Sequence, residues 1–207
     1  MVIVHRIFRR ELRLATGLVR AVALGDRPRA THLARYLTFV LDTLHHHHSG
    51  EDDLLWPKLL ARTTPDTQLI HRMQGQHEQM ATAVQAIEHV IPQWTRLADT
   101  TSRDRLADAI ERLYAQLSAH LDEEEEHLLP LVARHLTIAE WAQVGQRGLA
   151  GTPRSKRMIL LGAILEDAST EEATAFLAKI PAVARLAYRL VGQRQYAQWA
   201  ARVRGKA

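Results

Sequence analysis

The sequence contains no cysteine, which excludes disulfide bonds and metal sites built from thiolates. Runs of β-branched residues are rare, whereas alanine and leucine are frequent, and this balance favours helices. The longest apolar run, Met158 to Ile164, is too short to cross a bilayer. Residues 1–10 lack the long apolar stretch of a secretory signal. We therefore expect a helical, cytoplasmic protein with no membrane partner.

Charge is distributed unevenly along the 207 residues. Residues 1–136 hold 16 Lys and Arg against 18 Asp and Glu, whereas residues 137–207 hold 11 against 5. The sequence thus predicts two domains, a nearly neutral one over 1–136 and a basic helical extension over 137–207. The extension suits an acidic partner. No motif for sequence-specific nucleic-acid binding is present.

Turn signals divide the first domain into four expected helices, which predicts an all-α fold built as an up-down-up-down four-helix bundle. Ser102 is the expected N-cap of the fourth helix. The extension is expected to open with a capping box at Thr137 and Glu140 and to contain a glycine-rich linker over 145–153. The expected helices span residues 2–24, 29–61, 67–91 and 103–134, followed in the extension by 154–166, 170–179 and 181–203.

One short pattern occurs twice, on the second and fourth expected helices. His47 is followed four residues later by Glu51, and His120 by Glu124; a proline stands six residues after each glutamate. Residues four apart lie on one face of a helix, so each copy directs an imidazole and a carboxylate at the same place. Such ligands suit iron, manganese or zinc, and carboxylates can bridge two metals. Two copies facing each other across a bundle predict a dinuclear metal site.

The remaining two helices carry histidines, His5 and His77, on their apolar seams. In an antiparallel helix pair, residues equidistant from the turn lie at the same level. His5 and His47 are equidistant from a position within the first turn, Glu51 and His77 from one within the second, and His77 and His120 from one beside the third. All four helices should therefore bring polar side chains to one buried layer. Burying them without partners would cost several kcal/mol, roughly, so a metal is expected there.

With these motifs, residues 1–136 resemble the hemerythrin HHE cation-binding family, whose four-helix bundles hold a non-haem di-iron centre. The resemblance rests on His47-His48-x-x-Glu51-Asp52, on Gln76-His77-Glu78 and on His120-x-x-x-Glu124-Glu125. It implies two iron ions, bridged by an oxo or hydroxo group and by the carboxylates of Glu51 and Glu124. It implies terminal ligands at His5, His47, His77 and His120, with His48 and Glu125 as further candidates.

The sequence also departs from that family. Hemerythrins have a second histidine on the third helix, four residues from the first, but Met73 and Ala81 stand at those positions here. The missing ligand would leave a coordination position open to water, peroxide or nitric oxide. Their carboxylate on the fourth helix matches Glu125 by spacing, yet Glu124 lies on the seam. Glu124 and His127 form a ferritin-like Glu-x-x-His, which has no counterpart on the second helix.

Two classes of function remain open from the sequence. The first is a di-iron oxidoreductase, similar to a catalase or peroxidase, that binds or reduces O2, hydrogen peroxide or nitric oxide. The second is an iron or oxygen sensor, or an interaction module, whose metal state controls what the basic extension binds. Peroxide turnover would favour the first class, and iron-dependent binding without turnover would favour the second.

Overall fold

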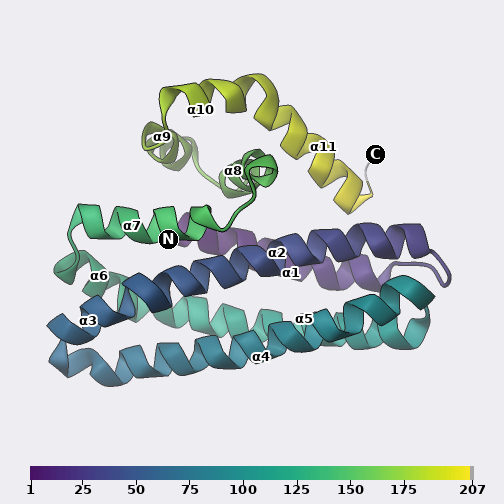
Figure 1. Cartoon of the computed structure of the whole chain (residues 1–207), viewed down its shortest axis with the longest axis horizontal. Helices are drawn as coiled ribbons and strands as arrows, with labels where there is room; N and C mark the ends of the chain where they lie inside the picture. The colour runs from purple at the N-terminus through teal and green to yellow at the C-terminus, as the bar shows by residue number, and fades with distance from the viewer. Residues whose placement is uncertain (206–207) are drawn as a thin grey trace. The chain divides into compact units, whose positions relative to one another are not determined.

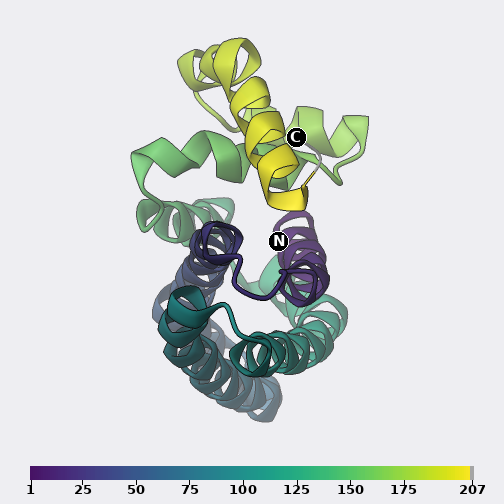
Figure 2. The same ribbon diagram turned by 90° about the vertical axis from the view of Figure 1, so that its right-hand side faces the viewer.

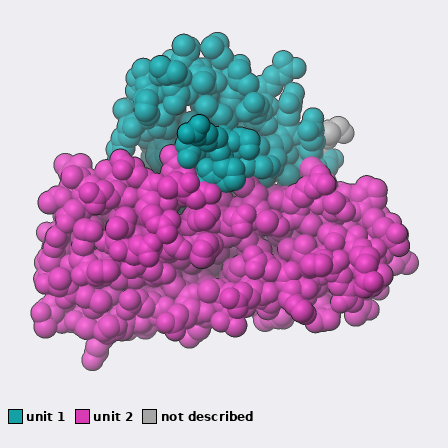
Figure 3. Space-filling model, viewed as in Figure 1, with its two compact units in different colours: residues 1–10, 152–207 teal, residues 11–151 magenta. Residues whose placement is uncertain are grey.

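The structure is a computed structural model that describes residues 1–205. The described residues are predominantly helical and contain no strand, so the predicted all-α class is confirmed (Figure 1). No helix among them is both long enough and apolar enough to cross a membrane. The chain forms two compact units, one of residues 11–151 and one of residues 1–10 together with 152–207; Figure 3 colours them separately. The predicted domain boundary after residue 136 stays a prediction.

The larger unit is built on three long helices, α2 (Arg27–Leu54), α4 (Thr67–Leu97) and α5 (Thr100–Glu123). Helix α4 packs against both α2 and α5, and residues 11–20 of α1 (Val2–Arg20) belong to the same unit (Figure 2). Leucine and isoleucine at spacings of three and four fill the interior. Fully buried examples are Leu33, Leu37, Leu44, Ile87, Leu106, Ile110, Leu113 and Leu117.

Proline decides where two of these helices end. The second helix ends at Leu54 instead of continuing to residue 61, because Pro57, which lacks an N–H, begins the separate helix α3 (Trp56–Arg62). Helix α5 likewise gives way to a π-helical turn, η2 (Glu124–Leu128), before Pro130 starts α6 (Leu129–His135). The first His-x-x-x-Glu pair therefore lies just before the end of its helix, and the second spans the junction of α5 and η2.

Other helix ends also differ from the prediction. Helix α4 continues through Pro92. Pro92 has no N–H to donate to the carbonyl of Glu88, but both residues are exposed, so water can bond to that carbonyl instead. Helix α1 ends at Arg20, and the following turn contains Gly25 with a φ of 81°, which favours glycine. Asp99, not Ser102, caps α5: its side chain accepts a hydrogen bond from the backbone N–H of Ser102 at 2.8 Å.

Helix α7 (Ile138–Ala150) begins at the predicted capping box of Thr137 and Glu140 and packs on α2. The linker predicted over 145–153 is wrong in its first part, because α7 runs on through Gly145 and Gly148. The close approach of α7 explains a glycine in α2: a Cβ at Gly50 would lie 3.4 Å from the carbonyl oxygen of Val144. The 3-10 turn η1 (Thr64–Asp66) completes this unit.

The smaller unit joins the start of α1 to the C-terminal helices. These are η3 (Arg154–Lys156), α8 (Arg157–Leu165), α9 (Thr170–Ala178), α10 (Ala182–Ala187), the π-helical η4 (Tyr188–Gly192) and α11 (Gln193–Arg204). Arg10, only 9% exposed, lies 2.9 Å from Glu166 and donates to the carbonyl of Ala163 at 2.9 Å. Arg6 makes two hydrogen bonds to Glu172, at 2.7 and 2.8 Å. Ion pairs thus hold the first turns of α1 within this unit.

Candidate metal centre

Two groups of metal-ligating side chains meet inside the larger unit. His47 and Glu51 of α2 gather with Glu124 of η2, and His48 of α2 gathers with His77 of α4 and His120 of α5. Within each group, the ligand atoms lie within 4.8 Å of one another. Glu51, Glu124, His48, His77 and His120 are buried, and the His47 side chain is 10% exposed. Each group has the composition of a transition-metal site.

The carboxylate of Glu51 lies between the two groups. Its Oε1 is 3.3 Å from Nε2 of His47, and its Oε2 is 3.6 Å from Nε2 of His77. Glu124 also approaches the second group, with Oε2 at 4.0 Å from Nε2 of His120. The carboxylates of Glu51 and Glu124 therefore each lie within 4.0 Å of a histidine of the second group.

The burial and charge of Glu51 favour a bound cation. Its side chain is fully buried, and neither of its carboxylate oxygens accepts a hydrogen bond from residues 1–205. Burial, and next the neighbouring carboxylate of Glu124, raise the pKa of Glu51 well above its usual 4.5. A divalent cation beside the two carboxylates would neutralise their charges and so offset the free-energy cost of burying them. The residues present therefore fit a metal.

The three histidines of the second group are in direct contact. The ring of His48 stacks on that of His77 with centroids 4.1 Å apart, and Nε2 of His77 lies 3.2 Å from Nε2 of His120. Trp56, fully buried, packs against His77 with ring centroids 5.5 Å apart. Trp56 belongs to a cluster of buried apolar residues. Other members of the cluster are Leu55, Leu59, Ile70, Met73, Leu128 and Leu131.

The structure brings most of the predicted ligands together. His47, Glu51, His77, His120 and Glu124 all belong to the two groups, and His48, a further candidate, joins the second one. Among the described residues, neither group includes Glu125, which is half-buried, or His127, which is exposed. His5 is buried on α1, in the part of that helix that belongs to the smaller unit. The coordinating roles of all these residues stay predictions.

Two neighbours of the histidines carried no predicted role. Oδ1 of Asp52 lies 2.7 Å from Nδ1 of His77, and Oε1 of Gln76 lies 2.7 Å from Nδ1 of His120. Burial raises the pKa of Asp52, but hydrogen bonds from His77 and Trp56 outweigh it, and the net pKa lies below the usual 3.8. A sequence signal did exist, because each of these residues adjoins a predicted ligand, Glu51 or His77.

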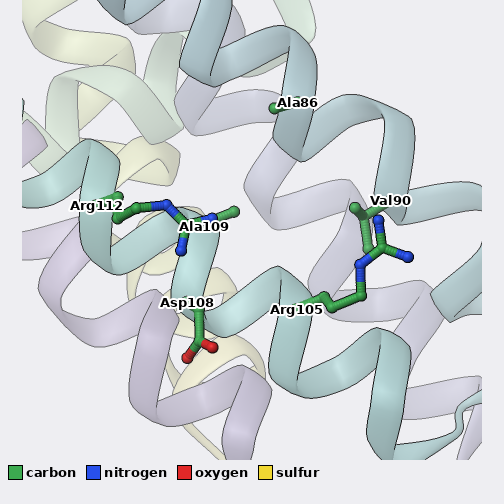
Figure 4. Close-up of a pocket in the computed structure, with 6 residues that line it drawn as sticks. All are labelled: Ala86, Val90, Arg105, Asp108, Ala109 and Arg112. Atoms are coloured by element: carbon green, nitrogen blue, oxygen red, sulfur yellow. The ribbon is translucent and has the colours of Figure 1, made fainter.

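A groove of about 200 Å³ lies between α4 and α5 (Figure 4). Its lining on α4, Ala86 and Val90, begins nine residues beyond His77, which corresponds to roughly 14 Å along a helix. Its remaining lining residues come from α5: Arg105, Asp108, Ala109 and Arg112. The groove is therefore not the entrance to the metal centre.

Comparison with known protein families identifies the domain that contains this site. Residues 1–132 match the family model described as the hemerythrin HHE cation binding domain. The chain belongs to this family. The match confirms the resemblance, and it identifies residues 1–132 as a metal-binding HHE domain that includes every predicted ligand. No curated protein and no solved structure matches the chain.

Proposed function

We propose that this HHE domain is a non-haem di-iron protein that binds or reduces O2, hydrogen peroxide or nitric oxide in the cytoplasm. The observation that carries the proposal is the position of Glu51, whose two oxygens face His47 and His77, one from each group. Glu124 would be the second bridge. Iron held by nitrogen and oxygen ligands with an open position supplies the binding and reduction of such small molecules.

The residues divide the work between two metal positions. His47, with His5 as a predicted partner, would hold one ion, and His48, His77 and His120 would hold the other. Met73 lies one turn before His77 on α4 and is fully buried. A thioether there is a poor ligand for iron, so this side of the second position is left for a small molecule. The apolar cluster around Trp56 would keep bulk water away from it.

The test is metal analysis and optical spectroscopy of protein made aerobically in iron-rich medium. We expect about two iron atoms per chain and an absorption in the near ultraviolet from an oxo- or hydroxo-bridged di-iron centre. The spectrum should change when the reduced protein meets O2, peroxide or nitric oxide. His77→Ala should abolish any turnover, because α4 offers no second ligand nearby. One zinc and no iron per chain would refute the di-iron proposal.

A second function, a metal-controlled interaction module, is favoured by the C-terminal helices. From residue 173 to the end, the sequence has seven Lys or Arg and no Asp or Glu. On α10 and η4, Val183, Leu186 and Leu190 are exposed by 82%, 57% and 71%. An apolar stripe with positive charge around it suits an acidic partner. Iron-dependent binding of such a partner, with no turnover of peroxide, would support this function over the first.

A further inference from the structure

The hydrogen bond between His77 and Asp52 determines which ring nitrogen of His77 carries the proton. Oδ1 of Asp52 lies 2.7 Å from Nδ1 of His77 and also accepts a hydrogen bond from Nε1 of Trp56 at 2.7 Å. An ionised carboxylate can only accept, so Nδ1 of His77 is the donor. In the neutral ring, Nε2 therefore presents a lone pair toward the centre.

A longer chain of contacts determines which ring nitrogen of His120 carries the proton. Arg72 donates to Oε1 of Glu123 at 2.6 Å, and Oε2 of Glu123 accepts from Nε2 of Gln76 at 2.8 Å. Because the amide nitrogen of Gln76 is engaged with Glu123, its Oε1 faces Nδ1 of His120 at 2.7 Å. Nδ1 of His120 must then donate, and its Nε2 presents a lone pair as well.

The two lone pairs face each other. Nε2 of His77 and Nε2 of His120 are 3.2 Å apart, which is hydrogen-bond distance, but two acceptors cannot form a hydrogen bond. While both rings stay neutral in these tautomers, a metal cation beside the two nitrogens would make the contact favourable. The hydrogen bonds at the two Nδ1 atoms thus leave the two Nε2 atoms with lone pairs that can bind a metal.

We propose that Asp52 and Gln76 are positioning residues, which hold His77 and His120 in the tautomers that can bind a metal, and that Glu123 and Arg72 fix the amide of Gln76. The inference rests on the proposed metal centre and deepens it. The two rings are not equivalent, since a carboxylate stands behind His77 and a neutral amide behind His120. The anionic partner should make His77 the stronger electron donor to a bound metal.

The experiment compares Asp52→Leu with Asp53→Leu as a matched control. Asp53 is the next residue of α2, but its exposed carboxylate pairs with Arg147 at 2.8 Å, away from the histidines. Nitrogen NMR of the metal-free protein reads the tautomer of each ring, and Fe(II) titration against a chelator reads the affinity. In Asp52→Leu we expect His77 to populate the Nε2–H tautomer and Fe(II) affinity to fall about 10- to 100-fold. Asp53→Leu should behave as wild type.

Two further variants keep the test informative if Asp52→Leu does not fold. Asp52→Asn retains an acceptor oxygen, so it should keep the wild-type tautomer of His77 and lose less affinity than the leucine variant. Glu123→Ala releases the amide of Gln76 without touching a ligand, so His120 should show both tautomers. Wild-type tautomers and affinity in Asp52→Leu and Glu123→Ala would overturn the positioning roles. Failure of wild type itself to bind iron would overturn the di-iron proposal instead, while the NMR measurements would still decide the tautomers.

Discussion

Replacing Glu51 by glutamine should change stability in opposite directions with and without metal. Glu51 is fully buried, neither of its oxygens accepts a hydrogen bond from residues 1–205, and Glu124 lies beside it. Without metal, an unsatisfied buried carboxylate lowers the stability of the fold by about 1–3 kcal/mol. Glutamine has the same shape and no charge, so Glu51→Gln should recover part of that cost. For a chain of this length, the unfolding midpoint should rise by about 2–4 °C per kcal/mol recovered.

With metal, the order should reverse. A ligand present at a hundred times its dissociation constant stabilises the folded state by about 2.7 kcal/mol. Wild type should gain this amount, whereas Glu51→Gln, having lost one bridging charge, should gain little. The metal-free proteins should also differ in their response to pH. Because the pKa of Glu51 is raised when folded, its contribution to stability is full below pH 4.5 and is lost as pH rises through the raised pKa. The Glu51→Gln protein should not show this loss of stability as pH rises.

The assay is thermal unfolding of wild type and variant, each with chelator and with excess Fe(II) under anaerobic conditions, at several pH values. Glu88→Gln is the control, because Glu88 is an exposed carboxylate on α4. It should match wild type under all conditions. A Glu51→Gln protein that is less stable than wild type without metal, or that gains as much stability from Fe(II), would refute the reasoning.

Three further predictions test other parts of the structure. Gly50→Ala should leave the unfolding midpoint nearly unchanged, since its Cβ would meet the Val144 carbonyl at 3.4 Å, whereas Gly50→Val should lower stability by about 1–3 kcal/mol in thermal unfolding. Glu166→Gln should flatten the acid-unfolding curve between pH 4.5 and about 2, because Arg204, against burial, lowers the pKa of Glu166 to about 2 and its stabilisation is lost over that range. His127→Ala should retain wild-type iron content by metal analysis, because that side chain is 52% exposed and belongs to neither group.

Helical spacing was enough to predict which side chains gather in the interior, but it could not decide between adjacent residues. An apolar seam selects one residue per turn, so the sequence favoured His47 and left His48 as a further candidate. In the structure, His48 stacks on His77 in the second group, whereas His47 lies in the first group with Glu51 and Glu124. Adjacent helical residues point about 100° apart, so a centre with two metal positions can use both. That choice depends on where α4 and α5 lie, which no local pattern specifies.

The prolines show a second limit. Pro57 and Pro130 begin new helices, as their neighbouring turns require, yet Pro92 lies inside α4. The same missing N–H has different consequences because the carbonyl that loses its donor can face water on the exposed side of α4. The exposure of a helix face is set by packing, so the sequence alone predicted the end of α4 wrongly.

The last turns of α2 explain why its short motif is so dense in polar residues. His47 and Glu51, four apart, form one row that serves the first group. His48, Asp52 and Trp56, also four apart, form a second row that serves His77, by stacking, by hydrogen bonding and by packing. The rows are displaced by one residue, so they lie side by side on the helix. A single helix therefore presents side chains to both groups and also a hydrogen bond to His77, and an insertion or deletion within the motif would separate the two rows.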